Sequence, residues 1–246
     1  MTYCLAMRLD EGLVFLSDTR TNAGIDNISI YRKLHVLQPA PDRAFSIQSA
    51  GNLATTQEVL DRIERDLAAT DGRETLATVA HLFEAALYVG RISREVVASH
   101  SEALGGSGAD GTATFILGGQ IEGERPEIFL VYPEGNYIRA SNTRPFLQIG
   151  ETKFGKFWLE LAVHARADLG QAIKISLGSM LSTTRANLSV GPPYDLAVYR
   201  NGALAFDEHR IEPTSDYLIE IQELFVQHLL AAVDELPPIP WAHSSS

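Results

Sequence analysis

Cysteine is almost absent from this 246-residue chain: Cys4 is the only one, so no disulfide can form within the chain. Such scarcity is typical of a reducing compartment, and we expect a cytoplasmic protein. Long apolar runs are also lacking, because no stretch approaches the roughly 18 residues that a transmembrane helix needs. The first residues contain no basic segment followed by an apolar run, which argues against a secretory leader. We therefore expect no membrane partner.

Basic residues are few as well. The chain has 20 Lys and Arg against 31 Asp and Glu, which gives a net charge of −11 and a pI near 5.1. This balance argues against nucleic acid as a partner. The seven histidines do not cluster with carboxylates at metal-ligand spacing, and the Gly/Ser-rich segment 104–111 lacks the lysine of a phosphate-binding loop. We expect neither a metal nor a cofactor.

Apolar residues are plentiful, at 45% of the chain, as in a globular protein with a sizeable core. Runs with alternating or continuous apolar residues predict strands, and a period near 3.6 predicts helices. Strands are expected at residues 5–9, 13–18, 29–37, 43–48, 112–117, 127–132, 136–140, 146–150, 194–200 and 203–211. Helices are expected at residues 52–69, 75–101, 152–167, 169–185 and 214–234, and a loop at 104–111.

This order predicts an α+β fold in which one sheet packs on another, with helices on each outer face. No stretch within it resembles a linker, so we expect a single domain over residues 1–236. The Pro/Ser-rich tail, residues 237–246, has no helical option. It is either disordered or laid on a neighbour, and Trp241 favours the second.

The chemically distinctive residue is Thr2. Removal of Met1 would leave a hydroxyl and an α-amine on this one residue. A threonine hydroxyl is a poor nucleophile until a base takes its proton, and an α-amine with an ordinary pKa of about 7.7–8.0 can be that base. Met-Thr alone does not identify an enzyme, because many chains begin this way. Cys4, in the same apolar strand, is expected to be a small core residue.

A nucleophile of this kind needs three further groups: a cation that keeps the amine neutral, a carboxylate that positions the cation, and a backbone N–H aimed at the developing oxyanion. The sequence offers Asp18, Lys33 and Gly51, the last at the change from strand to helix. Taken singly, Asp18 can cap a turn, Lys33 can face solvent and Gly51 can be a turn glycine. Their conjunction with Thr2 favours an N-terminal nucleophile.

Several segments carry a family resemblance together. They are Thr2, Leu16-Ser17-Asp18-Thr19-Arg20, Arg32-Lys33-Leu34, Ser49-Ala50-Gly51, the extension Thr21-Asn22-Ala23-Gly24, and Ile149-Gly150-Glu151-Thr152-Lys153-Phe154-Gly155-Lys156. The first segments resemble the opening of proteasome β subunits and bacterial HslV peptidases in residue type and spacing. Within that superfamily the chain is most similar to the bacterial Anbu proteins, over essentially its whole length. The resemblance implies the four-layer αββα sandwich of two antiparallel sheets found in N-terminal nucleophile hydrolases.

The resemblance also implies roles for residues. Thr2 would be the nucleophile and its own amine the base, with Lys33 easing deprotonation and Asp18 paired with Lys33. The Gly51 amide would bind the oxyanion, and Ser189 would assist the amine. Arg20, taken by itself and not from the resemblance, is expected to be a structural residue that pairs with an Asp or Glu beside the site.

Two positions depart from the family pattern. Ala186 stands where the proteasome has an aspartate, so that hydrogen bond is missing unless Asn187 supplies one. Glu151 stands where the relatives have a serine, and a carboxylate there would tend to hold a proton on the amine and weaken it as a base.

The function that this resemblance implies is a threonine-type peptidase that hydrolyses peptide or protein substrates. It further implies self-assembly into a closed ring or a helically staggered homo-oligomer. Two alternatives stay open. One is an amidase or transpeptidase with the same nucleophile, acting on a small amide or a modified peptide. The other is an assembly protein with a vestigial site.

Overall fold

The computed structural model describes residues 1–22, 28–108 and 110–241. By its internal contacts the chain falls into two compact units, Met1–Ile211 and Glu212–Ser246, each of which is described by itself. A single domain over residues 1–236 therefore stays a prediction. The same holds for the strap formed by the tail, of which residues 242–246 lie outside the described part.

The first sheet of the larger unit contains the N-terminal strand. Its antiparallel strands, in spatial order, are β10 (Phe146–Gly150), β1 (Tyr3–Arg8), β2 (Gly12–Asp18), β11 (Tyr194–Arg200) and β12 (Phe206–Ile211). Every residue of β2 is buried, as its continuous apolar sequence predicts for a strand covered on both faces. Because β1 lies between β10 and β2, Thr2 directly precedes an inner strand that is paired on both sides.

The second sheet is also antiparallel. Its strands are β5 (Leu34–Ala40), β6 (Arg43–Gly51), β7 (Ala113–Ile121), β8 (Glu127–Val131) and β9 (Tyr137–Arg139), in that spatial order. A small separate hairpin joins β3 (Arg20–Asn22) to β4 (Ile28–Ile30). Apolar side chains from both sheets, among them Cys4, Phe15 and Ile116, form one buried cluster. Cys4 is thus a core residue, as expected.

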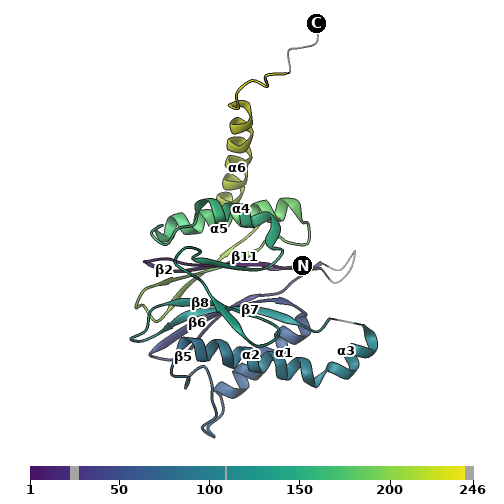
Figure 1. Ribbon diagram of the computed structural model, residues 1–246, viewed down its shortest axis with the longest axis vertical. Helices are drawn as coiled ribbons and strands as arrows, with labels where there is room; N and C mark the ends of the chain where they lie inside the picture. The colour runs from purple at the N-terminus through teal and green to yellow at the C-terminus, as the bar shows by residue number, and fades with distance from the viewer. Residues whose placement is uncertain (23–27, 109, 242–246) are drawn as a thin grey trace. The chain divides into compact units, whose positions relative to one another are not determined.

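Helices cover the outer face of each sheet, which gives the larger unit four layers (Figure 1). Helices α1 (Leu53–Leu67) and α2 (Leu82–Ser99) pack on the second sheet and bury a cluster that includes Phe115 and Phe129. Helices α4 (Thr152–Ala162) and α5 (Leu169–Ala186) pack on the first. The αββα sandwich predicted from the sequence is confirmed.

The second helix begins later than its sequence period suggests. Residues 75–81 form turns rather than the predicted first helical turns, and α2 starts only at Leu82. The Glu84 carboxylate accepts the backbone N–H groups of Ala80 and His81, a capping arrangement that fixes the start there. Leu76 and Val79 continue the apolar pattern of the helix toward the N-terminus. They lie in the segment before α2, and their side chains are buried there.

The predicted loop at 104–111 was wrong over its first half. Residues Ser101–Ser107 form a short helix, α3, that follows α2 at His100. It ends at Gly108, which adopts a left-handed conformation with φ +66°. Glu102, Ala103 and Leu104 favour helix strongly enough to outweigh the glycines, whose abundance predicts a loop.

The smaller unit contains helix α6 (Asp216–Asp234), whose first turn is capped by the Ser215 hydroxyl accepting the Leu218 N–H at 3.1 Å. Many of its apolar side chains are exposed, among them Leu229, Leu230 and Val233. Among all the described residues, no helix is long and apolar enough to cross a membrane.

Candidate active site

Thr2 lies at the start of β1, on the floor of a pocket of about 490 Å³. Its carbonyl oxygen accepts the Glu151 N–H at 2.7 Å, so the turn after β10 holds it in place. Lys33, Gly51 and Thr21 line the same pocket. The structure therefore brings together three of the residues that the sequence singles out.

Lys33 and Asp18 form a buried ion pair beside Thr2. The Lys33 ammonium donates to Asp18 Oδ1 at 2.8 Å and to the Arg20 carbonyl at 2.7 Å. The side chain of Asp18 is completely buried and that of Lys33 is 5% exposed. Asp18 also accepts the Tyr3 N–H at 2.9 Å and the Gly191 N–H at 3.3 Å. Both carboxylate oxygens of Asp18 accept these hydrogen bonds. Asp18 therefore holds the Lys33 ammonium in place and does not cap a turn.

The electrostatic surroundings favour a neutral amine at the N-terminus. Burial lowers the pKa of the Met1 α-amine, and the charge of Lys33 lowers it further, while Asp18 acts in the opposite direction. The Lys33 ammonium also lies 3.4 Å from the Met1 carbonyl oxygen, whose carbon is bonded to the Thr2 nitrogen. An amine on Thr2 would thus lie beside the same cation.

Asp18 itself is pulled in two directions. Burial raises the pKa of its carboxyl, whereas the Lys33 charge and hydrogen bond lower it, as do the Tyr3 and Gly191 amides. The largest effects that lower this pKa come from Lys33. The charged form of Asp18 therefore depends on the Lys33 ammonium beside it.

Gly51 ends β6 opposite Ala113 and has a φ of +115°. A β-carbon there would lie 2.5 Å from the Thr112 carbonyl oxygen, so the position needs glycine. Asn52 follows at once as the N-cap of α1, its side chain accepting the Thr55 N–H. The expected change from strand to helix thus falls at the pocket wall.

A hydrogen-bonded bridge links the remaining predicted residues. Asn187 donates to the Glu151 carboxylate at 3.0 Å and accepts the Ser189 N–H at 3.0 Å. Arg20 donates to the Leu188 carbonyl at 2.8 Å. The predicted ion pair of Arg20 was wrong for the described residues, since no Asp or Glu among them lies within ion-pair distance of it. Its guanidinium secures a backbone carbonyl instead.

Asn187 thus provides side-chain hydrogen bonds where Ala186 cannot. It ends α5, and its side chain reaches Glu151 at the other side of the site. Neither Ser189 nor Glu151 lines the pocket that contains Thr2. The described residues also contain no group of His, Cys, Asp and Glu arranged to hold a metal ion.

Gly150 is a site residue that the sequence did not single out. Its φ is +83°, and an added β-carbon would lie 1.9 Å from the Thr2 carbonyl oxygen. The only sequence signal was its place between Ile149 and Glu151 in the family block. A side chain at Gly150 would push Thr2 out of position.

We expect Gly150→Ala to lower the free energy of unfolding by about 3 kcal/mol or more, through left-handed strain and the clash with Thr2 together. Gly123→Ala is the matched control, because Gly123 has a φ of +85° and nothing within 4 Å of an added β-carbon. It should cost only the strain, about 1–2 kcal/mol. Urea denaturation of both variants measures the difference, and equal losses would show that Thr2 accommodates the clash.

The four layers, with Thr2 just before an inner strand of the sandwich, define the fold of an N-terminal nucleophile hydrolase. Solved structures of Anbu proteins match nearly the whole chain. Anbu (ancestral beta-subunit) from Yersinia bercovieri is 39% identical over 98% of this chain and 100% of its own, with a TM-score of 0.91. The helical assembly of the Anbu complex from Pseudomonas aeruginosa gives 39% identity over 98% and 100%, with a TM-score of 0.93.

The chain belongs to the Anbu family, which confirms the resemblance seen in its sequence. A Gly-1 mutant of Anbu from Hyphomicrobium sp. strain MC1 is similar as well, at 40% identity over 97% of this chain and 99% of that chain, with a TM-score of 0.89. No protein-family model and no curated protein sequence matches the chain.

Proposed function

We propose that this chain is a threonine-type peptidase in which removal of Met1 exposes Thr2 as an N-terminal nucleophile. One observation carries the proposal: Thr2, Lys33 and Gly51 line one pocket, and Lys33 is held there by the buried Asp18. These are a nucleophile, a cation and a backbone donor. Relatives described as ancestral β-subunits support the same class.

The reaction uses the Thr2 amine as the base. The amine accepts the hydroxyl proton while Oγ attacks the carbonyl carbon of the substrate amide. The resulting oxyanion is bound by the Gly51 N–H, and Lys33 stabilises the negative charge nearby. The C–N bond then breaks, and the leaving amine takes the proton. Water hydrolyses the ester on Thr2 by the same route, which releases the carboxylic acid and restores the hydroxyl.

The remaining predicted residues support this geometry. Ser189 is proposed to assist the amine, and Arg20 to hold the segment that carries Ser189. Glu151 positions Thr2 through its backbone N–H. Its carboxylate is engaged by Asn187, which draws it toward α5. We therefore expect Glu151 to hold a proton on the amine less strongly than an unbound carboxylate would, which leaves more of the amine free to act as base.

Self-association is part of the proposal. The relative from Pseudomonas aeruginosa is described as a helical assembly, which supports a ring or a helically staggered homo-oligomer for this chain. Light scattering of the purified protein tests it, and a monomer at micromolar concentration would contradict it. A cytoplasmic location is also proposed, and the single cysteine supports it.

Hydrolysis of a random pool of short unmodified peptides, followed by mass spectrometry, tests the activity. New termini that depend on Thr2 would establish a peptidase. If unmodified peptides stay intact while the nucleophile still reacts, the alternative of an amidase or transpeptidase on a modified substrate is favoured. An unreactive Thr2 would point to a vestigial site.

The activity should depend on pH through the amine. Burial and Lys33 lower the pKa of the Met1 amine, and an amine on Thr2 would lie beside the same cation. We therefore expect kcat/KM to rise with pH through a midpoint below the ordinary value of about 7.7. The protonated amine cannot accept the hydroxyl proton, so activity is lost on the acid side. Initial rates at subsaturating peptide between pH 5 and pH 9 measure the profile. A midpoint at or above about 8 would contradict a depressed amine pKa.

A further inference from the structure

Three hollows on the larger unit join into one groove that starts at Thr2. The pocket around Thr2 shares wall residues with a second hollow of about 520 Å³, which in turn shares wall residues with a third of about 340 Å³. The first shared wall is Ala50, Gly51 and Gly150, and the second is Leu130, Tyr132 and Gln148. The groove therefore runs away from the nucleophile along β10.

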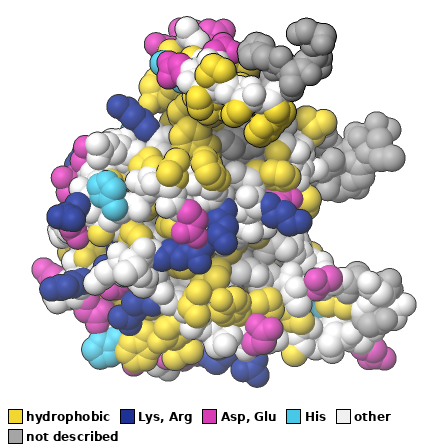
Figure 2. Space-filling model, turned by 45° about the horizontal axis from the view of Figure 1, so that its top comes forward, with side chains coloured by type: hydrophobic (Ala, Val, Ile, Leu, Met, Phe, Trp, Pro, Cys, Tyr) yellow, Lys and Arg dark blue, Asp and Glu magenta, His cyan; other side chains and the backbone are white. Residues whose placement is uncertain are grey.

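The far end of this groove is basic. Its wall contains Arg139, Arg144 and Lys156 and no acidic residue, although the chain as a whole carries a net charge of −11. Lys and Arg side chains also gather across the middle of the face drawn in Figure 2. A local excess of cations on an acidic protein favours an anionic ligand at this place.

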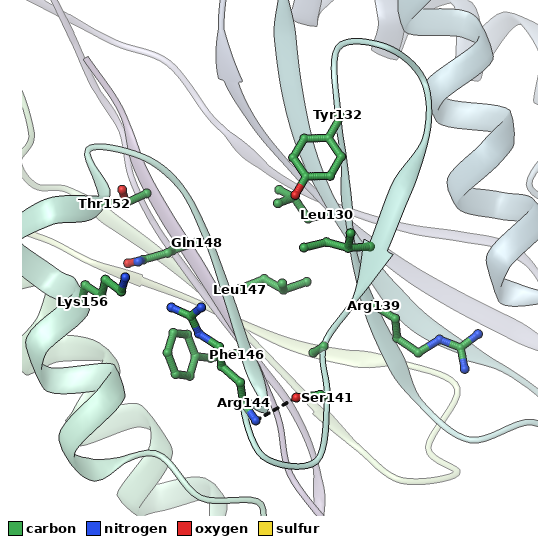
Figure 3. Close-up of a pocket in the computed structure, with 12 residues that line it drawn as sticks. Leu130, Tyr132, Arg139, Ser141, Arg144, Phe146, Leu147, Gln148, Thr152 and Lys156 are labelled. Atoms are coloured by element: carbon green, nitrogen blue, oxygen red, sulfur yellow. Dashed lines mark hydrogen bonds between the residues drawn. The ribbon is translucent and has the colours of Figure 1, made fainter.

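Two of the three cations point into the far hollow. Figure 3 shows the ends of Lys156 and Arg144 directed toward the space beside Gln148, whereas Arg139 points away. Arg144 stacks on the Phe146 ring at 5.0 Å and forms an exposed ion pair with Glu160 at 2.6 Å. Within the described part of the chain, Lys156 forms no ion pair with a carboxylate. Lys156 is therefore the principal cation available to a ligand.

The length of the groove sets the position of the anionic group. Gly150 contacts Thr2, and Phe146 lies four residues earlier in the same strand, which corresponds to about 13 Å. β10 is also the terminal strand of its sheet, so an extended chain can run beside it. A peptide in this position would place one of its side chains next to Lys156. That side chain would belong to a residue three to five positions from the scissile bond.

We propose that this groove binds one side of the substrate and that Lys156, assisted by Arg144, selects a carboxylate three to five residues from the scissile bond. The inference rests on the proposed peptidase function and adds a substrate class to it: peptides with an acidic residue at this distance. Lys156 and Arg144 determine specificity by contacting the substrate and take no part in bond cleavage.

The test measures binding apart from turnover. Fluorescein-labelled peptide pools carrying Glu, or Gln, at one position three to five residues on either side of the central bond are titrated against Thr2→Ala, which cannot cleave them. We expect one Glu pool to bind about fivefold more tightly than its Gln partner, as for contacts between exposed charges, with the difference lost at high salt. Lys156→Ala added to Thr2→Ala should abolish the difference.

Lys153→Ala is the matched control, since Lys153 is an exposed lysine on the same helix that does not line the groove. It should retain the preference for Glu. A charge reversal, Lys156→Glu, should favour pools that carry Lys instead. Equal binding of Glu and Gln pools, or a preference that survives Lys156→Ala, would overturn the inference.

The same experiment separates the two proposals. Selective binding that depends on Lys156, in a protein whose wild type cleaves no peptide, would support the groove and contradict the peptidase. Cleavage that depends on Thr2 without any preference for acidic pools would support the peptidase and contradict the groove.

Discussion

Thr2→Ala should abolish amide hydrolysis, with kcat/KM falling at least about ten-thousandfold, because it removes the hydroxyl that is proposed to form the acyl ester, and the other hydroxyl residues of the pocket, Thr21, Ser49 and Thr56, have no α-amine of their own to act as base. The substitution removes only the hydroxyl and one methyl group from a partly exposed residue, so the fold should be retained. Peptide turnover and urea denaturation, measured on the same preparations, give activity and stability side by side.

Thr2→Ser is the matched control for that variant. It keeps the hydroxyl and the amine and should retain activity within about a hundredfold of the wild type. Cys4 offers no substitute nucleophile, since it is buried between the sheets and burial raises the pKa of its thiol. Hydrolysis by Thr2→Ala at the wild-type rate would show that the activity resides elsewhere.

Lys33→Met should lose activity at least about a thousandfold and also lower the free energy of unfolding by about 3–5 kcal/mol. Asp18 would then be a completely buried carboxylate without its cation, held only by the amides of Tyr3 and Gly191. Denaturant unfolding together with peptide turnover measures both effects.

A second substitution separates the two losses. In Lys33→Met with Asp18→Asn, the buried charge is gone, so most of the stability should return while activity stays lost. The neighbouring Arg32→Met is the control for stability: it breaks an exposed ion pair of 2.6 Å to Glu208 and a longer one of 3.9 Å to the buried Asp195, which keeps its pair with Arg210, and should cost less than about 1 kcal/mol. A double variant as unstable as Lys33→Met would contradict this account of the pair.

Much of the fold follows from the pattern of apolar residues. The unbroken apolar run in β2 predicts a strand covered on both faces, and all of its residues are buried. The start of α2 could not be predicted, because the apolar period begins at Leu76 and the Glu84 cap overrides it. The helix α3 was missed for the opposite reason, since its glycines outweighed its helix-favouring residues in the prediction.

The candidate site was predictable only in part. The residue types at Thr2, Asp18 and Lys33 suggest a nucleophile, and the family resemblance predicts that Asp18 pairs with Lys33, as the structure shows. Residue spacing alone could not predict this contact, because the two residues come from separate parts of the chain. The bridge through Asn187 joins segments 36 residues apart and has no local signal. The basic end of the groove combines Lys156 and Arg144 from a helix and a loop, which no spacing rule connects.

The most direct test of the central claim is the intact mass of the protein before and after incubation with an epoxyketone peptide, a reagent that requires both the hydroxyl and the α-amine of an N-terminal threonine. The account predicts a chain without Met1 that gains one inhibitor mass per subunit, with no gain in Thr2→Ala. Retention of Met1 in protein purified from its native cells, with no adduct, would contradict an N-terminal nucleophile.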